Sequence, residues 1–122
     1  MAELWEQTAE MFGSLFTNPK MSKKLLMRPP FKYLLHIIIK TMRNIDGFCK
    51  GLYTEEELDF DYYKKNKMWK LVFLQKWIDI TEAMNETAYG ITPKEIAGGK
   101  SCDKTNLLLQ GFYQAGISGN ES

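Results

Sequence analysis

The feature that most constrains the fold of this chain is an apolar stretch between Arg28 and Gly51. It opens on a Pro29-Pro30 pair and closes on Asp46-Gly47, which are ordinary start and stop signals of a helix. Between these signals, apolar residues recur every three or four positions and widen into a broad stripe: Phe31, Leu34, Leu35, Ile37, Ile38, Ile39, Met42 and Ile45. A helix that is apolar over most of its surface packs inside other helices. We therefore expect an all-α domain built around this central helix.

Further helical patterns lie on both sides of the central helix. Capping residues, prolines and glycines delimit them, and we expect helices at 4–16, 23–27, 55–59 and 67–86, a short one from Thr92-Pro93 to Gly98, and a last one from Ser101 or Asp103 that frays after Gly116. The segment 59–67 is expected to be a loop held by its aromatic rings. Inward-facing side chains are predicted at Trp69, Val72, Phe73, Trp77, Ile80, Ala83, Met84, Leu107, Leu108, Leu109, Phe112 and Tyr113. About four main helices and short connecting ones therefore form the predicted bundle.

The length of 122 residues suits one domain with one core. We assign residues 1–117 to this domain and 118–122 to the start of a linker or disordered tail. No apolar run approaches the roughly 20 residues of a membrane span, and the acidic N-terminal segment does not resemble a signal peptide. We therefore expect a cytosolic protein without a membrane span. Cys49 and Cys102 stand far apart without a metal-ligand pattern, so we expect two reduced thiols and no metal site.

The charged residues are segregated along the chain. Residues 20–50 hold eight basic residues against Asp46 alone, residues 51–63 hold five acidic residues and no base, and residues 64–76 hold five lysines and no acid. Such blocks can fold into a surface with a basic and an acidic side. They suit either an ordinary solvated face or a surface that faces a polyanionic partner. Nucleic acid is the weaker partner, because the net charge is only +1 and no nucleic-acid-binding motif accompanies the lysines.

Residues with catalytic potential are sparse. The single histidine, His36, lies within the apolar helix without a local nucleophile or carboxylate, so we interpret it as a packed or rim residue. Gly99-Lys100-Ser101 imitates the end of a phosphate-binding loop but lacks its first glycine and its preceding strand. Asp59 and Asp61 are too few ligands for a calcium loop. The sequence therefore predicts a binding protein without a cofactor, and not an enzyme.

Several short motifs occur in one order and carry a family resemblance. They are Lys24-Leu25-Leu26, Pro29-Pro30-Phe31-Lys32-Tyr33-Leu34, Gly47-Phe48, Lys50-Gly51-Leu52-Tyr53-Thr54, Phe73-Leu74-Gln75-Lys76, Ile78-Asp79, Pro93 to Gly98, Lys104-Thr105-Asn106 and Leu108-Leu109-Gln110. With these motifs, the chain resembles the N-terminal calponin-homology domains of the microtubule-interacting TRAF-associated subunits of the intraflagellar transport B complex, over about residues 8–115. The resemblance implies a calponin-homology fold, in agreement with the predicted bundle.

The resemblance also implies a function, which is binding of tubulin or microtubules in ciliary transport. Tubulin has an acidic surface, so we expect the basic surface to meet it through Lys23, Lys24, Arg28, Lys32, Lys50, Lys76 and Lys104, with a secondary basic cluster of Lys64, Lys65, Lys67 and Lys70. Regions outside this chain would join other subunits of the complex. The implied locations are the cytoplasm, the cilium or flagellum, the basal body and the cytoskeleton. The alternative is a docking module for another transport subunit that does not touch tubulin.

Overall fold

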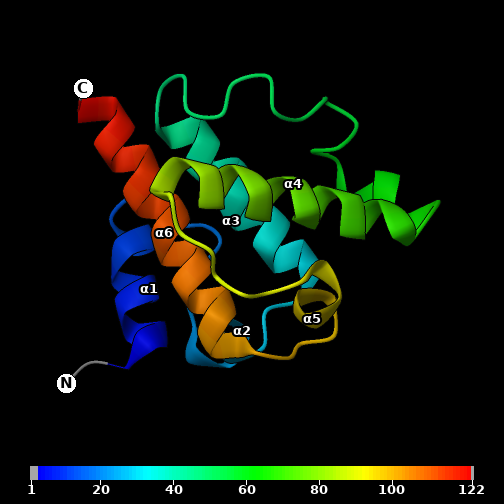
Figure 1. Cartoon of the computed structure of the whole chain (residues 1–122), viewed down its shortest axis with the longest axis horizontal. Helices are drawn as coiled ribbons and strands as arrows, with labels where there is room; N and C mark the ends of the chain where they lie inside the picture. The colour runs from blue at the N-terminus through cyan, green and yellow to red at the C-terminus, as the bar shows by residue number, and fades with distance from the viewer. Residues whose placement is uncertain (1–2, 122) are drawn as a thin grey trace.

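Figure 1 shows a computed structural model of the chain, which describes residues 3–121. Within these residues the elements are all helical: α1 (Leu4–Gly13), α2 (Lys23–Met27), α3 (Phe31–Asn44), the 3₁₀ helix η1 (Phe60–Lys64), α4 (Met68–Asn85), α5 (Pro93–Ala97) and α6 (Cys102–Glu121). Four longer helices and three short ones confirm the predicted all-α bundle. No helix in the described residues is long and apolar enough to cross a membrane.

The central helix α3 forms where the sequence predicts it. Pro30 is the N-cap, with extended backbone angles, and Ile45 ends the helix just before Gly47, whose φ of +74° suits a residue without a side chain. The side chains of Leu34, Leu35, Ile37 and Ile38 are fully buried. Helix α6 contacts α1, α2, α3 and α4, and Figure 1 shows α3 passing behind α4. The core therefore lies between α3, α4 and α6, with α1 and α2 closing one side.

The short helices follow from their local capping signals. Ser22 caps α2 by accepting a hydrogen bond from the Leu25 amide at 3.2 Å. Thr92 and Glu95 form the reciprocal capping box that opens α5 at Pro93. These two predictions are confirmed because each depends on residues within one turn.

The predicted acidic helix at 55–59 is wrong. The Thr54–Glu57 capping box does form, but the segment makes only i to i+3 hydrogen bonds, from Leu58 to Glu55 and from Asp59 to Glu56. Asp59 then takes an extended conformation and caps η1, which occupies most of the predicted loop. Aromatic rings hold the segment 59–67 as expected. Tyr63 is buried, and the ring of Tyr62 stacks on that of Trp69 with centroids 4.3 Å apart. Only one turn therefore fits between the Thr54–Glu57 capping box and the N-cap of η1 at Asp59.

The buried face of α4 is rotated from the predicted one. Phe73 and Trp77 are buried as expected, but Leu74, Ile78 and Thr81 complete the buried stripe. Val72 and Met84, which the periodicity placed inward, are 52% and 38% exposed. Ala83, also placed inward by the periodicity, is exposed as well. Apolar side chains on both sides of α4 made its periodicity ambiguous.

The terminal helices also differ from prediction at their ends. Helix α1 stops at Gly13, although Leu15 and Phe16 still pack against the core. Helix α6 continues to Glu121, since Gly116 packs closely against Ile45 and Phe48 instead of ending the helix. Within α6, Leu107 was expected to face inward but is 43% exposed.

Residues 1, 2 and 122 lie outside the described residues, so the boundaries at 1–117 and 118–122 stay predictions.

Candidate functional site

The basic residues of α2 lie along one edge of the bundle. The Lys23 ammonium lies 4.0 Å from the Glu3 carboxylate and 5.8 Å from the centre of the Trp5 ring. Lys24 and Arg28 are exposed. The Arg28 side chain lies across Gly99, where an added Cβ would stand 2.6 Å from Nε. Gly99 has a φ of +70°, which suits glycine, and its lack of a side chain leaves room for the Arg28 side chain on the turn between α5 and α6.

The lysine that opens α3 meets the predicted secondary cluster. The Lys32 ammonium lies 5.2 Å from the centre of the Phe60 ring, and the Lys64 ammonium lies 5.9 Å from the same ring. The Lys70 ammonium lies 5.5 Å from the ring of Phe31, next to Lys32 in sequence. Aromatic faces attract cations and hold them at the surface. We name Lys32, Lys64 and Lys70 the basic belt.

The remaining residues of the secondary cluster lie beside the belt. Lys65 and Lys67 precede α4 and are exposed. Lys64 also forms an ion pair with Asp61 at 2.9 Å, which lowers the pKa of the Asp61 carboxyl. The structure thus places Lys64 of the secondary cluster at the same ring as Lys32 of the first set.

Three predicted binding residues stand apart from the belt. Lys50 follows the C-terminal end of α3, whereas Lys32 lies in its first turn. The whole length of the helix, at about 1.5 Å of rise per residue, therefore separates the two lysines. The Lys104 ammonium donates to the Gly90 carbonyl at 3.0 Å. Lys76 forms an ion pair with Glu57 at 3.2 Å and lies over the Tyr53 ring. Lys76 and Lys104 therefore connect segments of the fold, which leaves their cations less available to a partner.

The ion pair of Lys76 with Glu57 leads to a prediction about acid stability. Burial raises the pKa of the Glu57 carboxyl, but hydrogen bonds from Thr54 and the Lys76 ammonium outweigh it and set the pKa below its ordinary value. A depressed carboxyl pKa stabilises the fold above the ordinary pKa, and this stabilisation is lost as the pH falls through the depressed value. Denaturant midpoints measured from pH 7 to pH 3 should fall more for the wild type than for Glu57→Gln. Parallel curves would mean that the pair contributes nothing.

Sequence reasoning missed two cations that extend the belt along α3. Lys40 and Arg43 share the outer face of this helix with Lys32 and His36, at spacings of three and four residues. His36 is exposed on this face, and desolvation together with Lys32 and Lys40 lowers the pKa of its imidazole. The helical spacing of these residues was a signal that could have identified them.

The other groups considered for chemistry show ordinary structural surroundings. Cys49 and Cys102 are free thiols, and burial raises the pKa of Cys49 to about 11. In the part of the chain that the structure describes, no three His, Cys, Asp or Glu side chains group as metal ligands would.

Comparison with known proteins identifies relatives of the chain. Residues 4–118 match the family described as the microtubule-binding protein MIP-T3 CH-like domain. The chain is 39% identical over 109 residues to TRAF3-interacting protein 1 of Rattus norvegicus, which is 89% of this chain and 16% of that protein. The protein of the same name is 38% identical over 109 residues in Mus musculus, or 89% of this chain and 17% of the relative. In Danio rerio it is 39% identical over 105 residues, or 86% of this chain and 16% of the relative. The chain thus spans a small part of the length of these relatives.

Proposed function

Because this chain belongs to the family of microtubule-binding MIP-T3 CH-like domains, we propose that it binds tubulin through the basic belt of Lys32, Lys64 and Lys70, together with Lys24 and Arg28 of α2. The family is one of binding domains and not of enzymes. The observation that carries the proposal is the meeting of Lys32 and Lys64 over the ring of Phe60. Two basic blocks that are separate in sequence contribute to one surface there.

Charge and geometry support this surface over the other lysines. The belt lysines lie over aromatic rings, which restrict their motion and lower the entropy cost of binding. Lys24 and Arg28 have no ion pair with any described residue, so both can attract the acidic surface of tubulin within a Debye length of about 8 Å. Lys76 and Lys104 are engaged within the fold. The ion pair of Lys64 with Asp61 is instead at the surface, with side chains 66% and 73% exposed, whereas Glu57 in the pair with Lys76 is only 14% exposed. We therefore leave Lys76 and Lys104 out of the proposed contact.

Charge reversal tests this surface directly. The variant Lys32→Glu with Lys64→Glu should bind tubulin about tenfold more weakly or worse, since two attractive contacts become repulsive. Lys20→Glu with Lys94→Glu is the matched control, because it changes the net charge equally at exposed positions outside the belt. Co-sedimentation with microtubules and thermal unfolding would be measured for each variant. A folded belt variant that binds like the wild type would place the contact elsewhere, and equal weakening by both pairs would indicate only a net-charge effect.

The cellular role follows the same proposal. The relatives are named for interaction with TRAF3 and are much longer than this chain, so we do not assign the TRAF3 interaction to this domain. By the family resemblance, we propose that it acts on the cytoskeleton of the cilium or flagellum, and that regions outside this chain join the other subunits of the transport complex.

A further inference from the structure

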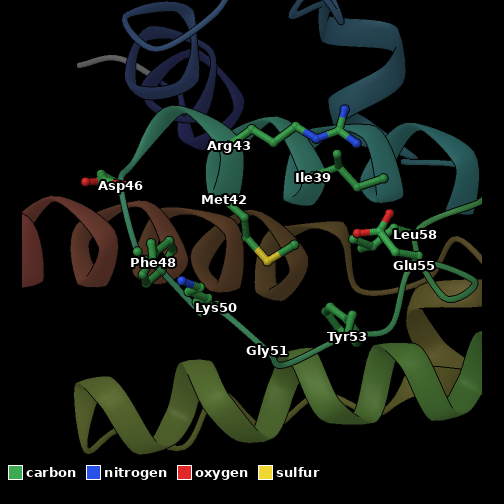
Figure 2. A pocket seen from close by; sticks show the side chains of 12 residues that line it. Ile39, Met42, Arg43, Asp46, Phe48, Lys50, Gly51, Tyr53, Glu55 and Leu58 are labelled. Atoms are coloured by element: carbon green, nitrogen blue, oxygen red, sulfur yellow. The ribbon is translucent and has the colours of Figure 1, made fainter.

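A groove runs along the outer face of α3, beside the segment 54–61. Two hollows of about 370 and 710 Å³ form it, and they adjoin each other because both are lined by Ile39, Arg43, Glu55 and Leu58. Figure 2 shows the smaller hollow, with Met42 pointing into it from α3, Phe48 and Lys50 toward one end, and Glu55 and Leu58 toward the other. We name the two hollows together the α3 groove.

The two walls of the α3 groove carry opposite charges. The α3 wall presents Lys32, Lys40 and Arg43, and the facing wall presents Glu55, Asp59 and Asp61, together with Lys64, which pairs with Asp61. Among the described residues, no ion pair within 4.0 Å joins one wall to the other. Lys40, Arg43, Glu55 and Asp59 have no ion pair with any described residue and are available to a partner.

The balance of charge in the groove determines which partner fits. Over its whole length the charged lining residues are Lys32, Lys40, Arg43, Lys50 and Lys64 against Asp46, Glu55, Asp59 and Asp61. A uniformly acidic segment would be attracted by the α3 wall but repelled by the facing wall at a similar distance. Lys32 and Lys64 of the basic belt line only the larger hollow, and the acidic side chains beside them make the rest of the groove a poorer site for an acidic tail.

The floor between the two walls is apolar. Ile39 and Tyr53 lie there with only 8% and 9% exposure, and Met42, Phe48 and Leu58 are half-buried. When another apolar side chain covers apolar surface of this kind and removes it from water, the complex is stabilised. The floor supplies affinity, and the charged walls supply orientation.

We propose that the α3 groove binds a segment of a second protein with an apolar side chain that seats on the floor. This segment carries a carboxylate that faces Lys40 and Arg43, and a cationic side chain that faces Glu55 and Asp59. The site is a second interaction surface, beyond tubulin binding, and its partner has mixed charge where tubulin is acidic. It is also the contact that a docking module for another protein requires.

Selection from a displayed random-peptide library on the folded domain tests this proposal. The enriched peptides should combine an apolar residue with both an acid and a base. Synthetic copies should bind Arg43→Glu and Glu55→Lys about tenfold more weakly each, as expected when one charge of a complementary contact is reversed. The pair Glu10→Lys with Lys94→Glu is the control, because it exchanges charge at exposed positions that do not line the groove. The control should bind these peptides like the wild type.

Several results would overturn the proposal. The absence of enriched peptides would do so, as would peptides that bind both groove variants as tightly as the wild type. Uniformly acidic peptides that bind Glu55→Lys more tightly would identify a simple anion site. Self-association of the wild type that Arg43→Glu abolishes would identify a second copy of the chain as the occupant. Arg43 and Glu55 are exposed, so both variants should fold, and thermal unfolding verifies this.

Discussion

Replacing Trp77 with alanine is expected to lower the free energy of unfolding by about 3–5 kcal/mol, the usual cost of removing a large buried ring. Trp77 is the largest fully buried side chain of the core, at 0% exposure. Its ring meets Phe112 of α6 edge to face, with centroids 5.9 Å apart, and Phe112 in turn packs on Phe48. The cavity would therefore open where α4, α6 and the turn after α3 meet.

The substitution Trp77→Phe distinguishes the packing of the ring from the cost of the unpaired indole N–H. The indole N–H has no hydrogen-bond partner among the described residues, and a buried unpaired donor costs about 1–3 kcal/mol. Phenylalanine keeps most of the packing and removes this cost, so it should lose much less stability than alanine. Chemical denaturation of the three proteins measures the difference. Equal losses for phenylalanine and alanine would contradict this account of the indole.

Gly111→Ala is the second substitution with a large expected effect. Gly111 is buried in α6, where a Cβ would overlap the Tyr89 hydroxyl and stand 2.8 Å from Tyr89 Cζ and 3.0 Å from Asn85 Nδ2. The Asn85 amide donates to the Gly111 carbonyl at 2.9 Å and to the Tyr89 hydroxyl at 3.1 Å. Alanine would push these groups apart, at a cost of about 1–3 kcal/mol from overpacking. This cost exceeds the gain in helix propensity of roughly 1 kcal/mol or less.

Gly13→Ala is the matched control for Gly111→Ala. Gly13 is the last residue of α1, and no atom lies within 4 Å of its added Cβ. This substitution should be neutral or slightly stabilising, because it restricts the unfolded chain without a clash. Thermal or denaturant unfolding should therefore separate the two variants. A Gly111→Ala protein as stable as Gly13→Ala would show that α6 and the 85–89 segment are not in close contact.

The fold was predictable where its signals are local. The apolar stripe of α3 and the caps at Ser22 and Thr92 depend on neighbouring residues, and the structure confirms them. The helix at 55–59 was not predictable from its capping box, since a cap at Asp59 ends it after one turn. The face of α4 depends on how α6 packs against it, which the spacing of apolar residues does not specify.

The candidate site was predictable only in part for the same reason. The basic blocks were visible in the sequence, but the meeting of Lys32 and Lys64 at Phe60 depends on how η1 folds back onto α3. The contact of Lys76 with Glu57 is also distant in sequence, and it ties a predicted binding residue into the fold. The α3 groove needs both its walls in place, so charge blocks alone could not identify it.

The measurement that tests the central proposal most directly is a titration of tubulin with the wild-type domain and the Lys32→Glu, Lys64→Glu variant at low and high salt. Tubulin trimmed of its acidic tails with subtilisin serves as the comparison. We expect tight binding by the wild type at low salt that weakens as salt screens the belt, and a variant that binds weakly at both concentrations. Trimming should weaken wild-type binding as well. Wild-type binding that depends on neither salt nor these two lysines would contradict the account.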